Sequence, residues 1–224
     1  MPSLLIHDTM QDIPPGIPNN ENLEYFASGG DDKSWLSFDK IKQYTNAFIV
    51  QDGKVLLGYK KRGFGQGKYN GFGGKVDAGE SSLQAAIREL QVPRFTSHIL
   101  NKLHLTFRLQ QEEAGIIAPL EHAGSLLFIS QGSEWAFQIE IYRAETFEGT
   151  ITESDEMRPE WFSINALPGK EEELLPIPFS KMWDTDEIWL PLLFEKKGFV
   201  GRADFTQDGE IFKPYKWWYG SLTS

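Results

Sequence analysis

Short apolar runs separated by turn residues begin at Tyr44 and continue along most of the chain, a pattern typical of a strand-rich fold. Residues 44–50 and 54–58 predict two strands, because they flank Asp52-Gly53, a pair that favours a tight hairpin turn. Residues 81–90 are rich in alanine, glutamine, leucine and arginine and predict a helix. Further runs predict strands at 125–129, 136–143, 199–205 and 210–212, the last two joined by Asp208-Gly209, and a last helix at 189–194. Strands and helices mixed in this order indicate the α+β class, with a sheet covered by helices.

Residues 1–40 do not share this regular pattern. They contain Pro14, Pro15 and Pro18, and residues 29–32 combine glycine with aspartate, so turn and loop chemistry dominates. We therefore expect a partly ordered N-terminal extension at residues 1–40, one domain at residues 41–219 and a short tail at residues 220–224.

Composition narrows the functions that this domain can have. Apolar residues make up 40% of the chain and aromatic residues 13%, which is typical of a globular protein with a sizeable core. The formal net charge of −10 argues against binding to polymeric nucleic acid, because phosphate backbones need a basic surface. A small triphosphate can still bind an acidic protein if a divalent cation supplies the positive charge. The absence of cysteine excludes disulfides, zinc–thiolate sites and thiol nucleophiles.

The sequence carries no signal for export or for a membrane. Its first residues lack the basic start and the apolar stretch of a signal peptide, and no apolar run approaches the roughly 18 residues that cross a bilayer. We expect a cytoplasmic monomer that does not bind membranes, with the nucleus and the mitochondrion as further compartments open to it.

The most informative segment runs from Gly74 through Glu80 to Arg88-Glu89-Leu90, and it resumes after a gap at Glu112-Glu113-Ala114-Gly115-Ile116. Without the gap, one continuous helix would place Glu89, Glu112 and Glu113 at positions i, i+3 and i+4, which share one face. Three carboxylates on one face are costly without a cation, and hard oxygen ligands favour Mg²⁺ or Mn²⁺. Such an ion bridges phosphate oxygens, orients a water molecule and neutralises charge when a phosphoanhydride breaks. An ordinary solvated acidic helix would explain Glu112 and Glu113 alone, but not the accompanying glycine and arginine positions.

Joined directly, these pieces read G-x5-E-x7-R-E-L-x-E-E-x-G-I, which resembles the complete signature of the Nudix hydrolases. The resemblance implies a Nudix fold, a mixed β-sheet sandwiched between helices, with an insert that interrupts the catalytic helix. It also implies that Arg88 braces the glycine loop by pairing with Glu80. The implied metal ligands are Glu89, Glu112, Glu113, Glu156 and the carbonyl group of Gly73. Of these, Glu112, Glu113 and Glu156 are the candidate catalytic residues, and either Glu113 or Glu156 would act as general base toward water.

The segments around this motif are similar to those of the oxidised purine nucleoside triphosphate hydrolases within the Nudix family. The similarity is carried by residues 60–65, 69–76, 153–159 and 181–183, within a stretch from about Tyr44 to Phe205. Such enzymes convert a damaged triphosphate to the monophosphate and pyrophosphate, which keeps damaged bases out of nucleic acid. By position, the residues implied to contact this substrate are Thr45, Lys60, Phe64, Asn70, Phe72, Gly73, Gly74, Lys75, Phe137, Trp183 and Asp186. Aromatic faces that stack on a purine, with a few polar groups for its edge, are what such a pocket needs.

Two positions depart from the family pattern, and both belong to the implied base pocket. Thr185-Asp186 stands where many members carry two adjacent aspartates, with Asp184 one position early, and Phe137 stands where the family has a methionine. The choice between 8-oxoguanine and 2-hydroxyadenine nucleotides therefore stays open. Core packing is the alternative role for Trp183 and, with more weight, for Trp189, and Asn70 could serve only as a turn residue.

Residues 92–111 separate the two halves of the motif. Pro93 falls where the helix should continue, at a cost of about 3 kcal/mol inside a helix, so the two halves cannot keep one helical register. The codons of Val92 begin with GT, the codon CAG for Gln111 ends with AG, and Leu105-Thr106 can encode a branch-point sequence. We therefore hypothesise that residues 92–111 are a short retained intron or an error of the gene model rather than a family insertion.

Two other functions stay open at this point. The chain could be a Nudix hydrolase for another nucleotide, such as a dinucleoside polyphosphate or ADP-ribose, which a substrate panel would distinguish. It could also be a catalytically inactive nucleotide-binding protein, if residues 92–111 belong to the mature chain and split the metal site.

The intron hypothesis makes a prediction about the messenger. We expect sequencing of the messenger population to find transcripts that join the codons of Gln91 and Glu112 directly. A population in which every transcript encodes residues 92–111 would exclude the hypothesis.

Overall fold

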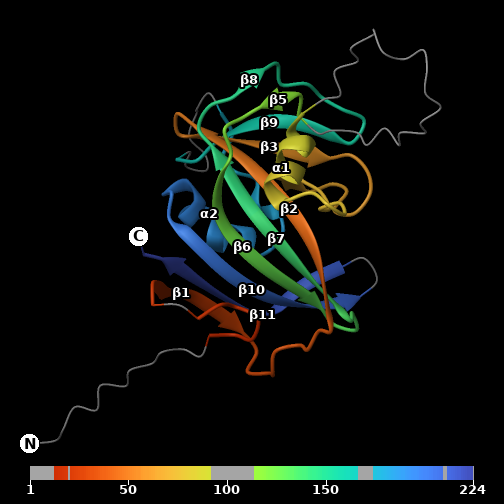
Figure 1. The fold of residues 1–224 in the computed structure, drawn as a ribbon, viewed down its shortest axis with the longest axis vertical. Helices are drawn as coiled ribbons and strands as arrows, with labels where there is room; N and C mark the ends of the chain where they lie inside the picture. Colours follow the sequence, from red (N-terminus) through yellow and green to blue (C-terminus); the bar gives the residue numbers. More distant parts are fainter. Residues whose placement is uncertain (1–12, 20, 92–113, 166–173, 209–210, 224) are drawn as a thin grey trace, which may run out of the picture.

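The computed structural model describes residues 13–19, 21–91, 114–165, 174–208 and 211–223. Their largest feature is a nine-stranded sheet in the order β1-β11-β10-β6-β7-β2-β3-β4, with β9 paired to β3 (Figure 1). A second sheet joins β5 and β8. The strands are β1 Leu23–Gly30, β2 Lys40–Gln51, β3 Lys54–Lys60, β4 Tyr69–Asn70, β5 Ile116–Ile117, β6 Glu121–Ser130, β7 Trp135–Ala144, β8 Glu148–Gly149, β9 Met157–Ser163, β10 Gly198–Asp208 and β11 Ile211–Leu222. The helices are α1 Ser82–Leu90, α2 Asp186–Phe194 and a short 3₁₀ helix, Phe179–Lys181.

The main sheet is mixed, as the Nudix resemblance implies. β2 runs parallel to β7 and β10 runs parallel to β6, whereas the other adjacent strands pair antiparallel. The register of β2 places Thr45 opposite Glu140 and Asn46 opposite Ile141 of β7. Two polar residues of β2 therefore lie well inside the sheet rather than at its edge.

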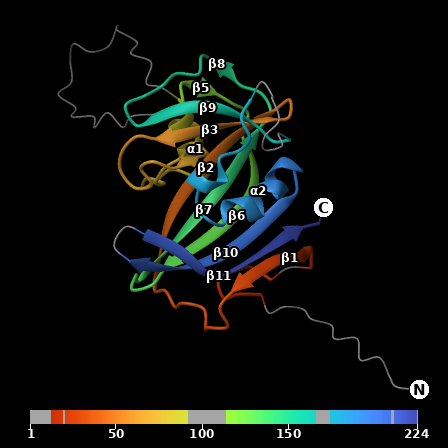
Figure 2. The same ribbon diagram turned by 180° about the vertical axis from the view of Figure 1, so that it is seen from behind.

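β2 is buried on both faces because each face carries its own helix. Phe48 and Val50 belong to the core cluster that includes the apolar side of α2. Ala47 and Ile49 belong to the cluster on the other face, which includes the apolar side of α1. A strand covered on both sides carries a nearly continuous apolar run, which explains the pattern at residues 44–50. The prediction of a mixed sheet sandwiched between helices is confirmed (Figure 2).

α1 begins where the sequence predicts, because its first turn carries a capping box. The Ser81 hydroxyl accepts a hydrogen bond from the Gln84 backbone N–H at 3.2 Å, and the Gln84 side chain accepts one from the Ser81 N–H at 2.8 Å. The helix ends at Leu90, since the backbone of Gln91 is extended. Neither α1 nor α2 is long and apolar enough to cross a membrane.

The chain returns to α1 on the other side of residues 92–113. Ala114 and Ile116 are fully buried in the same core cluster as Leu90. The two described ends of the split motif therefore pack against one core. The predicted continuation of the catalytic helix through Glu112 and Glu113 lies outside the described residues.

Most of the other predicted elements are present and are longer than expected. The runs at 125–129 and 136–143 are parts of β6 and β7, and the last helix begins at Asp186 instead of Trp189. The closing hairpin consists of β10 and β11, which extend well beyond the predicted runs. Backbone pairing with neighbouring strands holds the additional residues, and this pairing leaves no apolar pattern in the sequence.

The domain boundaries differ from the prediction at both termini. Residues 23–30 form β1, which pairs antiparallel with β11 from Leu23 opposite Leu222 to Gly30 opposite Lys216. The expected extension thus contributes an edge strand to the main sheet, and the expected tail contributes the end of β11. None of the residues of β1 is fully buried, so the strand lacks the apolar alternation by which strands are recognised in a sequence.

A buried ion pair anchors the segment before β2 to the sheet. Arg202 and Asp204 of β10 are completely buried, and the arginine donates hydrogen bonds of 2.9 and 3.1 Å to the two carboxylate oxygens. The guanidinium also donates to the carbonyl groups of Pro15 at 2.6 Å and Leu36 at 2.5 Å, and Asp204 accepts from the Leu36 N–H at 2.6 Å. The Trp35 ring lies 4.9 Å from the guanidinium carbon. Residues from the expected extension therefore satisfy both buried charges.

Removing one partner of this ion pair should destabilise the fold strongly. We expect Arg202→Met to lower the free energy of unfolding by about 3 to 5 kcal/mol, because Asp204 would keep a buried charge without its partner. The double variant Arg202→Met/Asp204→Leu should lose less, since it leaves no uncompensated charge. Urea denaturation compares the three chains, and an equal loss in the single and double variants would contradict this role of the pair.

Candidate active site

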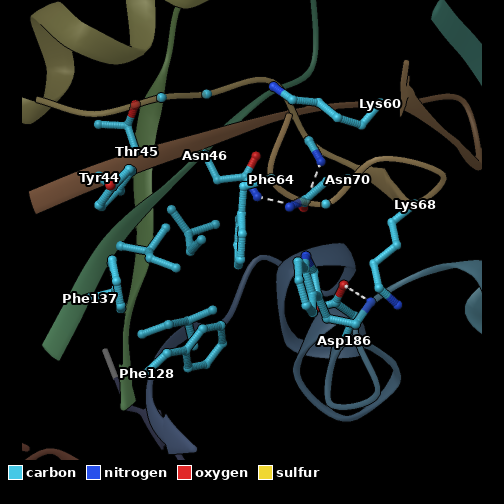
Figure 3. A pocket seen from close by; sticks show the side chains of 18 of the residues that line it. Tyr44, Thr45, Asn46, Lys60, Phe64, Lys68, Asn70, Phe128, Phe137 and Asp186 are labelled. Atoms are coloured by element: carbon cyan, nitrogen blue, oxygen red, sulfur yellow. Dashed lines mark hydrogen bonds between the residues drawn. The ribbon is translucent and has the colours of Figure 1, made fainter. Parts of the chain in front are cut away.

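A cavity of about 910 Å³ brings β2 and β7 together with the loop after β3 and the segment that leads into α2. Its lining includes many of the residues that the sequence singled out: Thr45, Lys60, Phe64, Asn70, Gly73, Gly74, Glu89, Phe137, Glu156, Trp183 and Asp186. Figure 3 shows Asn70 between Lys60 on one side and Asp186 on the other, with Phe137 on β7 across the cavity. Carboxylates, amides and aromatic rings therefore share one cavity.

Two residues predicted to contact the substrate do not line this cavity. Phe72 is completely buried and packs in the core cluster beneath α1, so it supports the loop rather than the ligand. Lys75 is exposed, and its carbonyl group accepts a hydrogen bond from Arg88 at 3.1 Å. The lining of the cavity therefore gives no support to a substrate contact at these two positions, and that part of the prediction stays a prediction.

The segment at residues 71–74 lies so close to β2 and to Glu89 that neither Gly73 nor Gly74 has room for a side chain. The Thr45 N–H donates to the Gly74 carbonyl at 2.9 Å, and the Ala47 N–H donates to the Phe72 carbonyl at 2.7 Å. A Cβ atom at Gly73 would lie 1.9 Å from the Thr45 carbonyl oxygen, and one at Gly74 would lie 2.4 Å from a carboxylate oxygen of Glu89. Glycine at these positions lets the backbone approach both β2 and the carboxylate of α1.

Arg88 joins the glycine loop to α1, as the Nudix resemblance implies. Its Nε and Nη2 atoms donate to the two Glu80 carboxylate oxygens at 3.2 and 2.6 Å, and its Nη1 donates to Glu89 at 2.5 Å. Burial raises the pKa of Glu89, the nearby charge of Glu156 raises it further, and Arg88 and Lys60 act in the opposite direction. The predicted pairing of Arg88 with Glu80 is confirmed.

Glu89 and Glu156 supply the described part of the predicted metal site. Lys60 donates a hydrogen bond to Glu156, and Arg62 lies 3.9 Å from the other carboxylate oxygen. Two carboxylates close enough to influence each other, one of them buried, are oxygen donors suited to a hard divalent cation. Within the described residues no group of three acidic or histidine side chains could hold a metal ion, and Glu112 and Glu113 lie outside that part of the chain.

Asp186 lies at the start of α2, beneath the cavity. It is almost completely buried, and it accepts hydrogen bonds from the Trp183 backbone N–H at 3.1 Å and from the Trp189 indole N–H at 3.2 Å. Burial raises the pKa of Asp186 to about 7, although both hydrogen bonds and the nearby Lys68 lower it. Near neutral pH this side chain can therefore be present as a carboxylic acid that donates a hydrogen bond.

Aromatic rings form one wall of the cavity. Phe64 stacks on Trp183 with ring centroids 5.3 Å apart, and Phe212 meets both rings edge-on at 5.5 and 6.1 Å. The Lys68 ammonium lies 4.9 Å from the Trp183 ring centroid and donates to the Met182 carbonyl at 2.8 Å. Rings arranged in this way can stack on a flat aromatic ligand.

Comparison with known proteins decides the family. The chain is 42% identical over 165 residues to the oxidised purine nucleoside triphosphate hydrolase of Danio rerio, covering 73% of this chain and 86% of the relative. It is 38% identical over 173 residues to the mouse (Mus musculus) protein of the same name, covering 77% and 91%. This chain belongs to the oxidised purine nucleoside triphosphate hydrolase family.

The fold agrees with this assignment. A MutT protein from Bacillus halodurans superposes with a TM-score of 0.53 at 22% identity, covering 80% of this chain and 97% of the other. The architecture is that of the Nudix hydrolases, which generally use divalent metal ions. A search against family models found no match.

The two departures from the pattern of these hydrolases have different structural consequences. Thr185 is completely buried beside the Tyr219 phenol, and neither residue lines the cavity. Asp184 is exposed and is also absent from the lining, so it does not replace the missing aspartate. Phe137 does line the cavity, where its ring lies 5.7 Å from that of Tyr44.

Several lining residues were missed in the sequence, among them Tyr44, Asn46, Lys68, Phe128 and Phe212. Asn46 offered a signal, because it is a polar residue inside the apolar run of a strand buried on both faces. Trp189, for which core packing was the weightier alternative, packs in the core on Phe48 and Phe199 and also reaches Asp186. Asn70 lies in the short strand β4 rather than in a turn.

Asp186 should make stability fall as the pH rises. An aspartate in the unfolded chain has a pKa near 4, whereas Asp186 in the folded chain has a pKa of about 7. Between about pH 4 and pH 7 the folded chain therefore keeps a proton on Asp186 that the unfolded chain has released. The free energy of unfolding should therefore decrease by on the order of 4 kcal/mol from about pH 4 to above pH 7. Asp186→Asn should remove this part of the profile in urea denaturation at several pH values. The control is Asp52→Asn, which changes an exposed aspartate of the β2–β3 turn that does not line the cavity, and it should leave the profile unchanged. An unchanged profile for Asp186→Asn would contradict the buried proton.

Proposed function

We propose that this chain is a metal-dependent pyrophosphohydrolase that converts oxidised purine nucleoside triphosphates to monophosphates and pyrophosphate, and so removes damaged precursors of nucleic acid. The observation that carries the proposal is the single cavity in which Glu89 and Glu156 meet the Phe64–Trp183 pair and the amide of Asn70. The names of the two relatives support the same class of substrate.

The aromatic and amide groups of the cavity would bind the base. A purine can stack on the rings of Phe64 and Trp183, and its polar edge would meet Asn70 and Asp186. Because the pKa of Asp186 is about 7, its protonated form can donate to a base carbonyl or ring nitrogen, and its ionised form can accept.

We propose Mg²⁺ as the metal ion, with Mn²⁺ as a substitute. The proposed ligands are Glu89, Glu112, Glu113, Glu156 and the Gly73 carbonyl group. When bound, the cation neutralises phosphate charge and lowers the pKa of a water molecule. Lys60 and Arg62, which lie beside Glu156 at the cavity, would contact phosphate oxygens and offset part of the net charge of −10.

The reaction is hydrolysis of a phosphoanhydride. The oxygen of water forms a bond to phosphorus, the bridging P–O bond breaks, and the monophosphate separates from pyrophosphate. Glu156 or Glu113 would accept the proton of the water as general base. Arg88 would orient Glu89, because its guanidinium donates hydrogen bonds to both Glu89 and Glu80.

The active form in this proposal lacks residues 92–111. Ala114 and Ile116 pack in the same core cluster as Leu90, which supports a mature chain in which Gln91 is followed by Glu112 on one helix. A direct connection would return Glu112 and Glu113 to the face of α1 that carries Glu89.

The test measures pyrophosphate release from 8-oxo-dGTP, 2-hydroxy-dATP, dGTP and dATP with Mg²⁺ and with excess EDTA. We expect the chain without residues 92–111 to hydrolyse the oxidised nucleotides faster than the normal ones, and only with the metal ion. In the same chain, Glu89→Gln should lower kcat by about a hundredfold or more, because an essential carboxylate is lost. The matched control is Glu153→Gln, which changes a more exposed carboxylate that pairs with Lys61 and does not line the cavity.

Each outcome separates the candidate functions. Activity only in the shortened chain would support both the reaction and the intron hypothesis. Equal activity in both chains would mean that the helix tolerates residues 92–111. Nucleotide binding without turnover in either chain would favour a catalytically inactive binding protein.

A further inference from the structure

Two asparagines lie side by side in the cavity, one on β2 and one on β4. The Asn46 side chain is 92% buried, since its exposed fraction is 8%, and its Nδ2 donates a hydrogen bond of 2.6 Å to Oδ1 of Asn70 (Figure 3). The backbone N–H of Gly71 donates to the same Asn70 oxygen at 2.9 Å. Both side chains line the cavity that holds the aromatic pair.

These two hydrogen bonds favour the orientation of the Asn70 amide in which its oxygen faces both donors, and the donor on Gly71 belongs to the backbone and cannot turn away. A carbonyl oxygen has two acceptor lone pairs, and the donors on Asn46 and Gly71 use both. Rotating the Asn70 amide by about 180° would lose the bond from Gly71, and it would also lose the bond from Asn46 unless the Asn46 amide rotated as well. The backbone donor cannot be changed by a side-chain substitution, but the second donor depends on Asn46.

Asn46 is held at this position although its own oxygen is poorly satisfied. Its Oδ1 is buried and has no hydrogen-bond partner within the described part of the chain. This oxygen lies against Gly71, where a Cβ atom would be only 2.3 Å away. An apolar side chain at this buried position of β2 would avoid the free-energy cost of an unpaired oxygen. The hydrogen bond that Asn46 makes is donated by its NH₂ group, so this group is the one that acts on the cavity.

We propose that Asn46 is a positioning residue that makes Asn70 a hydrogen-bond donor only, and that it thereby selects purines with a carbonyl oxygen at position 6 over purines with an amino group there. The inference rests on the proposed function, since it assigns a preference to the same cavity. It favours 8-oxoguanine-type bases over 2-hydroxyadenine-type bases as the preferred form of damage.

The selection follows from complementarity at one atom of the base. A carbonyl oxygen accepts a hydrogen bond from Nδ2 of Asn70, whereas an amino group would bring two donors together. An asparagine that is free to rotate presents either end to a ligand and discriminates weakly. The donor on Asn46 adds to the restraint from the Gly71 backbone, because rotation of Asn70 then breaks two bonds or forces the buried Asn46 amide to rotate as well.

The experiment measures binding of two nucleoside monophosphates, 8-oxo-dIMP and 8-oxo-dAMP, which differ in the group at position 6. Isothermal titration calorimetry without metal ion measures both affinities in the full chain and in the chain without residues 92–111. We expect the unchanged protein to bind 8-oxo-dIMP at least about tenfold more tightly, as one gained or lost hydrogen bond implies. Because these ligands are not hydrolysed, the result does not depend on catalysis.

Three variants assign the preference to Asn46. Asn46→Leu keeps the volume and removes the donor, so the affinity ratio should narrow toward one. Asn46→Asp places an acceptor opposite the Asn70 oxygen, so the amide should rotate and the ratio should invert. Asn165→Leu, which changes an exposed asparagine that does not line this cavity, should leave the ratio unchanged.

Steady-state kinetics with the corresponding triphosphates, 8-oxo-dITP and 8-oxo-dATP, distinguish a positioning role of Asn46 from a general loss of structure in the variant. In Asn46→Leu the change should appear in KM, while kcat for the 6-oxo substrate stays within about twofold, because Asn46 acts on the base and not on the phosphates. Retention of the full preference in both Asn46→Leu and Asn46→Asp would overturn the inference. Equal binding of the two nucleotides to the unchanged protein would also overturn the inference about Asn46, but it would leave the proposed function standing. Binding of neither nucleotide would overturn both the inference and the proposed function. If Asn46→Asp does not fold, Asn46→Leu alone decides.

Discussion

The segment 71–74 lies so close to β2 that only glycine fits at Gly71 and Gly73, and the arrangement of the site depends on that contact. The paired backbones bring Asn46 of β2 next to Asn70, and they bring the loop against the buried carboxylate of Glu89. Arg88 then holds the loop to α1 from the other side through Glu80. A side chain at Gly73 or Gly74 would displace the loop from the strand or from the carboxylate, and the groups that meet a base would separate from those that meet phosphates.

Local signals in the sequence were sufficient for the elements that carry the chemistry. The composition of residues 81–90 predicts α1, and the Nudix resemblance implies that Arg88 reaches Glu80. The same signals could not predict β1, because an edge strand without a buried residue is held by backbone hydrogen bonds that any sequence can make. They also could not place Phe72, since the direction of a side chain in a glycine-rich loop depends on backbone angles that glycine leaves open.

Long-range polar contacts were the second class that the sequence could not predict. Arg202 and Asp204 resemble ordinary exposed charges of a strand until the segment from Pro15 to Leu36 covers them. Asn46 resembles an interruption of an apolar run until Asn70 and Gly71 are placed beside it. In both cases a buried polar group is explained by partners far away in the sequence, and only the assembled sheet brings those partners together.

The pairing of β1 with β11 has a consequence for synthesis of the chain on the ribosome. Leu23 lies opposite Leu222, and the Thr223 N–H donates to the Asn22 carbonyl at 2.8 Å, so the first described strand meets the last one. A nascent chain emerges from its N-terminus, and β1 must therefore wait until β11, the last strand of the main sheet to be made, has left the exit tunnel. Until then the Arg202–Asp204 anchor is also missing, and residues 13–38 have no sheet to cover. β1 is thus made before the other strands of the main sheet and docks after them, so emergence of β11 from the ribosome is the step that completes the sheet.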